Sequence, residues 1–166
     1  TTTLCLIPAV REATTLPLIA AGGIGTGEAI FALMALGAEG VQMGTRFALT
    51  DESSASDIFK EYCLRLNEGD TKLLLKKLAP TRLVTNSFRD RVEAAEGRGA
   101  SAEELRELLG RGRAKKGIFE GDLEEGELEI GQVAALFRRR QSVDEVMKEL
   151  LEGYRRASDK IRSVGL

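Results

Sequence analysis

Two short apolar runs separated by an apolar helix dominate the first fifty residues. Residues 16–21 are apolar on both faces and are followed by two glycines, which is typical of a strand buried in a parallel sheet. Residues 25–36 predict a helix with Thr26 as its N-cap, and the segment 29–36 is apolar nearly all round, so this helix is expected to be well buried. Residues 40–43 predict a second short strand. Two strands joined by a helix of this length are expected to be parallel neighbours.

Helices are expected before and after this unit. Residues 4–13 predict a short helix, and residues 56–67 predict another with its apolar side chains on one face. Ser101 and Ser142 are each followed three residues later by Glu, which has the form of a capping box at the start of a helix. The second of these helices carries an apolar stripe over residues 143–161.

This pattern divides the chain after residue 50. Residues 1–50 are expected to be βα units of an α/β fold, and residues 51–166 a helical region that packs on them. Two strands cannot close a barrel, and their open edges must pair with other strands. The chain starts with Thr instead of Met, so we expect it to begin inside a longer protein.

Composition narrows the classes of function. The 166 residues include 24 Lys or Arg and 26 Asp or Glu, giving a net charge of −2. A nucleic-acid-binding protein needs a basic excess and is not expected. No stretch approaches the roughly 20 apolar residues of a membrane span, and the N-terminus lacks the regions of a signal peptide, so we expect a cytoplasmic protein. Cys5 and Cys63 lack the spacing of metal ligands.

The sequence contains no histidine. It therefore has no imidazole acid or base for neutral pH, and it cannot form a Ser–His or Cys–His pair. If the fold is that of an enzyme, either a cofactor carries the chemistry or the catalytic groups lie outside these residues. We assign no catalytic residue and no metal ligand within the chain.

Two glycine-containing segments follow the two predicted strands. Gly22 and Gly23 come after the first strand, and Gly44 and Thr45 come after the second. In α/β barrels the loops after the seventh and eighth strands commonly hold a phosphate. Glycine lets a phosphate reach backbone N–H groups without a Cβ in the way, and Thr45 adds a hydroxyl donor. A glycine pair alone is more often a tight turn, but the two segments together predict one shared phosphate site.

These segments carry a resemblance to a known family. Ala-Ala-Gly-Gly-Ile at 20–24 and Leu-Gly-Ala-Glu-Gly-Val-Gln-Met-Gly-Thr-Arg-Phe at 36–47 resemble the nitronate monooxygenase (2-nitropropane dioxygenase) family, which includes flavin-dependent enoyl-acyl carrier protein reductases of bacteria. The resemblance continues through 52–54, 81–83 and 119–132 and covers essentially the whole chain. It implies the last two strands of an FMN-binding TIM (β/α)8 barrel, followed by a helical extension.

The resemblance also implies a cofactor site. The family's FMN phosphate pattern maps onto Ala21, Gly22, Gly23, Gln42, Met43, Gly44 and Thr45, with Ala21 lining the loop by its backbone. The family's catalytic His lies upstream of the segment that matches residues 1–10. The chain therefore keeps the phosphate end of the flavin site, and by itself it is expected to be inactive.

Two activities are implied for the parent enzyme. In the reductase, hydride passes from NADH or NADPH to FMN and then to an enoyl thioester of fatty acid synthesis, and residues 103–122 resemble this branch somewhat more. In the monooxygenase, an alkyl nitronate reduces the flavin and O2 completes the reaction. The partners would be a small-molecule or acyl-thioester substrate, an acyl carrier protein and, in a homodimer, a second copy. A non-catalytic chain that binds FMN, and a barrel acting on a sugar phosphate, stay open as alternatives.

Three other features have both a functional and a structural interpretation. Residues 126–132 could cover the flavin or shape the nicotinamide site, or they could form a turn leading into a helix over 133–140. A basic loop comprises Arg111, Arg113, Lys115 and Lys116. This loop could meet NADPH phosphates or an acidic carrier protein, or it could simply be solvated. Arg46 could touch the phosphate or form a structural salt bridge.

Overall fold

The computed structural model describes residues 2–164, and the chain divides into two compact units. One consists of Thr1–Glu52 together with Gln141–Leu166, and the other of Ser53–Arg140. This division differs from the boundary expected after residue 50, because the last helix of the chain belongs to the unit that contains the N-terminal residues.

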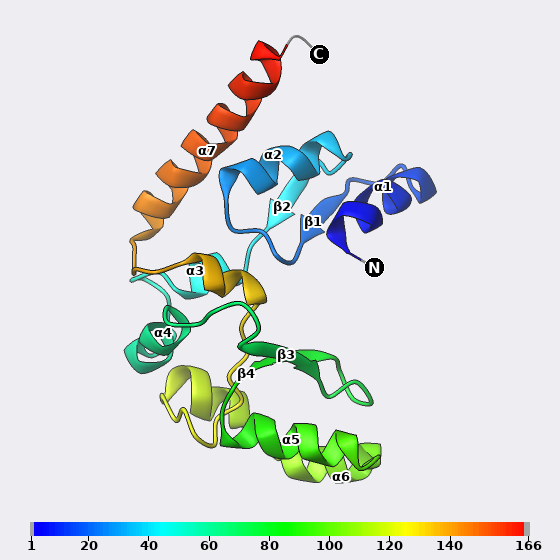
Figure 1. Ribbon diagram of the computed structural model, residues 1–166, viewed down its shortest axis with the longest axis vertical. Helices are drawn as coiled ribbons and strands as arrows, with labels where there is room; N and C mark the ends of the chain where they lie inside the picture. The colour runs from blue at the N-terminus through cyan, green and yellow to red at the C-terminus, as the bar shows by residue number, and fades with distance from the viewer. Residues whose placement is uncertain (1, 165–166) are drawn as a thin grey trace. The chain divides into compact units, whose positions relative to one another are not determined.

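The first unit is built on a βαβ motif (Figure 1). Strand β1 (Ile19–Ala21) leads into helix α2 (Gly27–Ala35), which returns the chain to strand β2 (Gly40–Gln42). The strands are parallel, and the register pairs their first residues with each other and their last residues with each other. The predicted strand–helix–strand order and the mixed α/β class are therefore confirmed.

Three further helices belong to this unit. They are α1 (Thr3–Ala13), α3 (Thr45–Ala48) and α7 (Val143–Ser163). Helix α7 lies alongside α2, as Figure 1 shows. It starts at the predicted capping box, in which the Ser142 hydroxyl accepts from the Glu145 N–H while the Glu145 carboxylate accepts from the Ser142 N–H.

The core of the first unit is small. Its buried residues are Ile7, Ala20, Ile24, Leu33 and Ala38. Helix α2 is less buried than its apolar sequence predicts, since only Gly27 and Leu33 are buried and Met34 is 41% exposed. Ile19 in β1 is 54% exposed although it lies in a strand expected to be covered on both faces. Within residues 2–164 no third strand pairs with β1 or β2, so both outer edges of this sheet lack a partner strand.

The stripe predicted for α7 is only partly covered. Val146, Leu150 and Gly153 are buried, whereas Met147 and Leu151 are 43% and 51% exposed. Residues that follow one another in a helix are about 100° apart around its axis, so the covered side does not extend to Met147 and Leu151. In the described part of the chain no helix is both long and apolar enough to span a membrane.

The second unit combines an antiparallel hairpin with short helices. Its helical elements are α4 (Asp57–Cys63), α5 (Ser87–Gly97), α6 (Ala102–Leu109), the π-helical η1 (Lys115–Phe119) and the 3-10 helix η2 (Gln132–Leu136). Strands β3 (Thr71–Leu74) and β4 (Thr81–Val84) form the hairpin. The region after residue 50 is thus not purely helical, because Pro80 cannot continue a helix and the Thr and Val residues of β4 favour extended structure.

The core of the second unit joins the hairpin to α5 and α6. Its buried residues are Leu74, Leu75, Leu83, Phe88, Val92, Ala95, Ala100 and Leu105. Ser101 and Glu104 form the predicted capping box at the start of α6. The helix expected over 133–140 is instead the short η2. Cys63 is buried, which raises the pKa of its thiol to about 12, whereas Cys5 in the first unit is exposed.

Candidate functional site

The two glycine segments lie next to each other at the carboxyl ends of β1 and β2. Ala21, the last residue of β1, is opposite Gln42, the last residue of β2. The chain therefore leaves the sheet at neighbouring positions, through Gly22 after one strand and Met43 after the other. The structure brings the predicted segments together as the parallel arrangement requires.

The backbone of these segments is bare and faces open space. Gly22 and Gly23 have φ angles of +90° and +72°, a region that side chains other than glycine rarely adopt. Gly44 has an ordinary φ of −90°. A Cβ built at Gly22, Gly23 or Gly44 would meet no heavy atom within 4 Å. A ligand can therefore approach the main chain at all three positions, and at Gly44 the local backbone does not itself require glycine.

The remaining predicted residues differ in exposure. Ala21, Gly22, Gly23, Gln42 and Gly44 are exposed, whereas Met43 and Thr45 are half-buried. Met43 packs against the core of the first unit, so its side chain serves packing and its main chain is the part that could meet a ligand. Thr45 is the first residue of α3, whose N-cap Gly44 supplies no side-chain hydrogen bond.

Two N–H groups at the start of α2, those of Glu28 and Ala29, donate to side chains of the same turn. The Thr26 hydroxyl accepts from the Ala29 N–H at 3.2 Å, which confirms the predicted N-cap. The pKa of Glu28 is lowered, first by a hydrogen bond from its own backbone N–H and further by Arg156, whose guanidinium lies 3.1 Å from the carboxylate. Glu28 therefore stays ionised, and an anion near this helix would depend on the glycine segments for its donors.

Arg46 follows the second segment and forms a structural salt bridge. It is 7% exposed, and its Nη2 donates to Gln141 Oε1 at 3.0 Å and to Glu149 Oε2 at 2.5 Å. The salt-bridge interpretation of Arg46 is thereby confirmed. The guanidinium bonds to side chains at and beside α7, so we do not count Arg46 among the donors of the candidate site.

A comparison with protein families matches residues 1–153 to the family described as nitronate monooxygenase. The chain belongs to the nitronate monooxygenase family. The family indicated by the glycine segments is thus confirmed over nearly the whole sequence.

Individual relatives agree with this membership. The chain is 39% identical over 98 residues to a probable nitronate monooxygenase of Staphylococcus aureus (strain JH9), a match covering 57% of this chain and 27% of that protein. It resembles the structure of FabK from Thermotoga maritima with a TM-score of 0.90 and 33% identity, over 99% of this chain and 52% of that one. Nitroalkane oxidase from Streptomyces ansochromogenes gives a TM-score of 0.75 and 30% identity, over 96% and 45%. The chain spans about half the length of these two solved structures.

In this member of the nitronate monooxygenase family, residues 126–132 contact strand β4 through an isolated β-bridge between Glu129 and Leu83. The Val84 N–H donates to Leu128 O at 3.0 Å, and the Ile130 N–H donates to Arg82 O at 3.4 Å. The segment therefore runs antiparallel to β4 before it enters η2. This pairing favours the structural interpretation of the segment, with a β-bridge and the short helix η2 in place of the expected turn and longer helix.

Glu127, within this segment, has an unusual ionisation. Burial raises the pKa of its carboxyl group to about 7, the neighbouring Glu129 carboxyl adds to the rise, and Arg113 opposes it. Sequence reasoning missed this residue. The alternation Glu127-Leu128-Glu129-Ile130 could have indicated that the two carboxyl groups lie on the same side of an extended segment, but not that Glu127 is buried.

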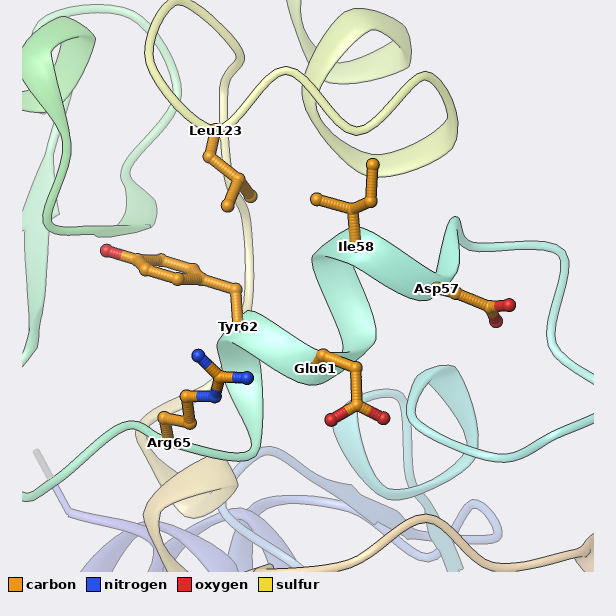
Figure 2. Close-up of a pocket in the computed structure, with 6 residues that line it drawn as sticks. All are labelled: Asp57, Ile58, Glu61, Tyr62, Arg65 and Leu123. Atoms are coloured by element: carbon orange, nitrogen blue, oxygen red, sulfur yellow. The ribbon is translucent and has the colours of Figure 1, made fainter.

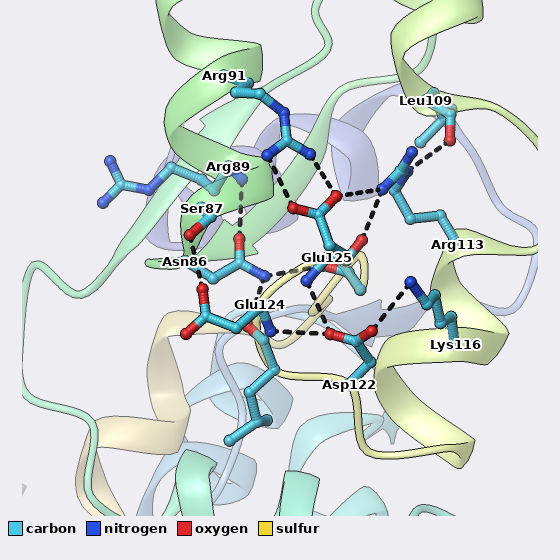
Figure 3. A network of polar contacts seen from close by, with 12 residues as sticks. Asn86, Ser87, Arg89, Arg91, Leu109, Arg113, Lys116, Asp122, Glu124 and Glu125 are labelled. Atoms are coloured by element: carbon cyan, nitrogen blue, oxygen red, sulfur yellow. Dashed lines mark hydrogen bonds and ion pairs between the residues drawn. The ribbon is translucent and has the colours of Figure 1, made fainter.

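Three of the four basic residues in the loop that could have met cofactor phosphates form ion pairs within their own unit. The pairs are Arg113–Glu125 at 3.4 Å, Lys115–Glu120 at 3.3 Å and Lys116–Asp122 at 2.9 Å. Figure 3 shows Arg113 and Lys116 directed towards the loop that carries Asp122 and Glu125. Arg113 also lies 4.4 Å over the ring of Phe88. These contacts favour the structural interpretation of the loop.

A cavity of about 350 Å³ in the second unit contains none of the predicted site residues. It is lined by Asp57, Ile58, Glu61, Tyr62, Arg65 and Leu123 (Figure 2). The Tyr62 hydroxyl donates to Thr85 O at 2.6 Å, and burial raises its pKa, so the phenol stays protonated and engaged. Within residues 2–164 no group of His, Cys, Asp or Glu is arranged to hold a metal ion. The strand ends of the first unit therefore remain the best candidate site.

Proposed function

We propose that the ends of β1 and β2 bind the phosphate group of FMN, and that the chain is the phosphate-binding part of a flavin-dependent oxidoreductase. The observation that carries this proposal is the pair of bare glycine segments at neighbouring carboxyl ends of parallel strands. Such loops are where α/β barrels commonly hold a phosphate.

The chemistry of the segments fits this group. The residues that would hold it are Ala21, Gly22, Gly23, Gln42, Met43, Gly44 and Thr45. Main-chain N–H groups bind phosphate oxygens well, and glycine allows their close approach. Bound here, FMN would supply the electron and hydride transfer, while these residues orient it. The chain contains no His, so an imidazole acid or base would come from outside residues 1–166.

The sheet also supports a place among the last two strands of a (β/α)8 barrel. Strands of parallel barrels are covered on both faces and paired on both edges. Ile19 in β1 and Leu16 just before it are 54% and 70% exposed, and each strand has one outer edge without a partner strand in the described residues. Further βα units of a barrel would cover these exposed side chains and pair with the two outer edges.

For the reaction, we favour reduction of an enoyl thioester, with NADH or NADPH as electron donor and an acyl carrier protein as carrier of the substrate. The TM-score of 0.90 to FabK, against 0.75 to nitroalkane oxidase, supports this choice. The second candidate is oxidation of an alkyl nitronate with O2, and the 39% identity to a probable nitronate monooxygenase supports it.

Binding is tested by titrating the chain with FMN and with riboflavin, which lacks the phosphate, and following flavin fluorescence. We expect FMN to bind at least about tenfold more tightly, which corresponds to ~1.4 kcal/mol from the phosphate contacts. Gly44→Ala should remove most of this preference, because its methyl group enters the open space without straining the backbone. The matched control is Gly97→Ala, which also adds a methyl group in open space but in α5.

The outcomes separate the hypotheses. Equal affinity for FMN and riboflavin, or no binding of either, would overturn the phosphate site. With FMN bound, bleaching of the flavin by NADPH and recovery by crotonyl thioester would support the reductase. Bleaching by propionate 3-nitronate without NADPH would support the monooxygenase. FMN binding with neither reaction is the result expected of residues 1–166 alone, which contain no His, so the reductase, the monooxygenase and a non-catalytic chain are then separated by the same assays on the parent enzyme.

A further inference from the structure

Three side chains connect the second glycine segment to the start of α7. Arg46 donates through Nη2 to Gln141 Oε1 at 3.0 Å and to Glu149 Oε2 at 2.5 Å. Gln141 closes the triangle by donating from Nε2 to Glu149 Oε1 at 2.6 Å. Arg46 and Gln141 are 7% and 5% exposed. The Glu149 side chain is 46% exposed, so the network has two buried members and one at the surface. Charge-assisted hydrogen bonds are stronger than neutral ones, which favours a single arrangement of these three side chains.

Main-chain contacts extend the same connection. The Asp51 N–H donates to Gln141 O at 3.0 Å, and Thr50 and Gln141 form an isolated parallel bridge. The carboxylate of Glu52 accepts from the Val143 N–H, with both oxygens at 3.0 Å. The residues that follow α3 and those that begin α7 are therefore joined by backbone and side chain together.

Helix α7 also holds the helix that follows the first glycine segment. Gly27 at the start of α2 lies directly against the α7 backbone, since a Cβ there would come within 2.0 Å of Leu150 O. Farther along, the rings of Phe31 and Tyr154 meet edge to face at 5.5 Å. Helix α7 therefore contacts the elements that follow both glycine segments. It packs against α2, which follows Gly22–Gly23, and it bonds to Arg46, which follows Gly44–Thr45.

We infer that Arg46 is a positioning residue for the phosphate site, acting through Gln141 and Glu149 to hold the Gly44–Thr45 amides at a fixed place relative to Gly22–Gly23. This inference rests on the proposed function. Amides fixed before the ligand arrives need no ordering when it binds, so their rigidity adds to affinity. Arg46 acts without touching the phosphate, because its guanidinium is directed to Glu149.

The test measures the Kd of FMN and of riboflavin, and the Ki of inorganic phosphate against FMN, for the wild-type chain and for Glu149→Gln and Arg46→Lys. A positioning role predicts that Kd for FMN and Ki for phosphate each rise about tenfold in Glu149→Gln, while riboflavin affinity changes less than about twofold. Arg46→Lys should behave similarly, since an ammonium group lacks the planar fork that bonds to two partners. Glu152→Gln, an exposed change one turn along α7, is the matched control and should leave every constant unchanged.

Each other result overturns the inference in a recognisable way. If Arg46 bound the phosphate directly, Arg46→Lys would weaken FMN binding while Glu149→Gln would leave it unchanged or tighten it. If the network served stability alone, FMN and riboflavin would weaken by the same factor, together with a fall in Tm. If the wild-type chain shows no preference for FMN over riboflavin and no competition by phosphate, the proposed function itself fails. If the wild-type chain shows the preference and both variants retain it, only the positioning role of Arg46 fails.

Discussion

Gly27 of α2 lies so close to α7 that a Cβ built on it would be 2.0 Å from the carbonyl oxygen of Leu150. The same Cβ would be 2.3 Å from the Tyr154 nitrogen and 2.7 Å from the Gly153 carbonyl carbon. Only glycine allows two helix backbones to approach in this way. Because these are main-chain atoms, no side-chain rotation can make room for a larger residue.

Gly27→Ala is expected to destabilise the first unit, although alanine is the better helix former by about 1 kcal/mol. The methyl group forces α2 and α7 apart, and overpacking of this kind costs about 1–3 kcal/mol. Urea unfolding followed by circular dichroism measures the change. Gly97→Ala in α5 is the control, since its methyl group meets nothing within 4 Å, and it should be neutral or slightly stabilising. Equal stability of Gly27→Ala and wild type would show that the helices are not packed this closely.

Asn86 joins the start of α5 to a loop nearly forty residues later (Figure 3). Its Oδ1 accepts from the Arg89 N–H at 2.8 Å as the N-cap of α5. Its Nδ2 donates to Leu123 O at 3.0 Å and to Gly126 O at 2.8 Å. One amide group therefore caps a helix and fixes a loop at the same time.

Asn86→Ala should lower the free energy of unfolding by about 2–4 kcal/mol, since the cap contributes about 1 kcal/mol and each of the two part-buried hydrogen bonds to the loop about 0.5–1.5 kcal/mol. Asn86→Asp separates the two roles, because a carboxylate keeps the cap but cannot donate to Leu123 O or Gly126 O. We expect Asn86→Asp to leave α5 helical while proteolysis in the 122–126 loop becomes faster. An Asp variant with unchanged loop cleavage would contradict the loop-fixing role.

The features that could be predicted from the sequence are set by local chemistry. Thr26 caps α2, and Ser101 and Ser142 start capping boxes, because each partner lies only three residues away. The neighbouring glycine segments were also predictable, since a strand–helix–strand unit places its strand ends side by side.

What could not be predicted depends on contacts between distant residues. The partner of Arg46 in α7 lies 103 residues later, and periodicity contains no information about such a pair. The β3–β4 hairpin was missed because its short strands carry little alternation. The main-chain hydrogen bonds that Leu128 and Ile130 form with β4 come from residues more than forty positions away. The same limit hid the burial of Glu127, which depends on how residues 126–130 pair with β4.

The pKa of Glu127 makes stability depend on pH. Burial, followed by the nearby Glu129 carboxyl, raises this pKa from the ordinary value of 4.5 to about 7. Below pH 4.5 the residue is protonated in both the folded and the unfolded chain. Between pH 4.5 and about 7 the unfolded chain releases the proton while the folded chain retains it, so folding becomes less favourable as the pH rises.

We therefore expect the second unit to lose stability on the order of 1–3 kcal/mol as the pH rises from 5 to 8. Glu127→Gln resembles the protonated form and should remove this part of the loss, so that the variant exceeds the wild type most clearly at pH 8. Glu129→Gln should give a smaller benefit, because it removes a neighbouring charge but leaves Glu127 buried. Urea midpoints measured across this range for the three proteins test the expectation. Carboxyl groups whose pKa is lowered, such as that of Glu125, contribute equally to all three curves, so their contribution disappears from the difference between curves. Parallel curves for wild type and Glu127→Gln would show that Glu127 ionises normally in the folded chain.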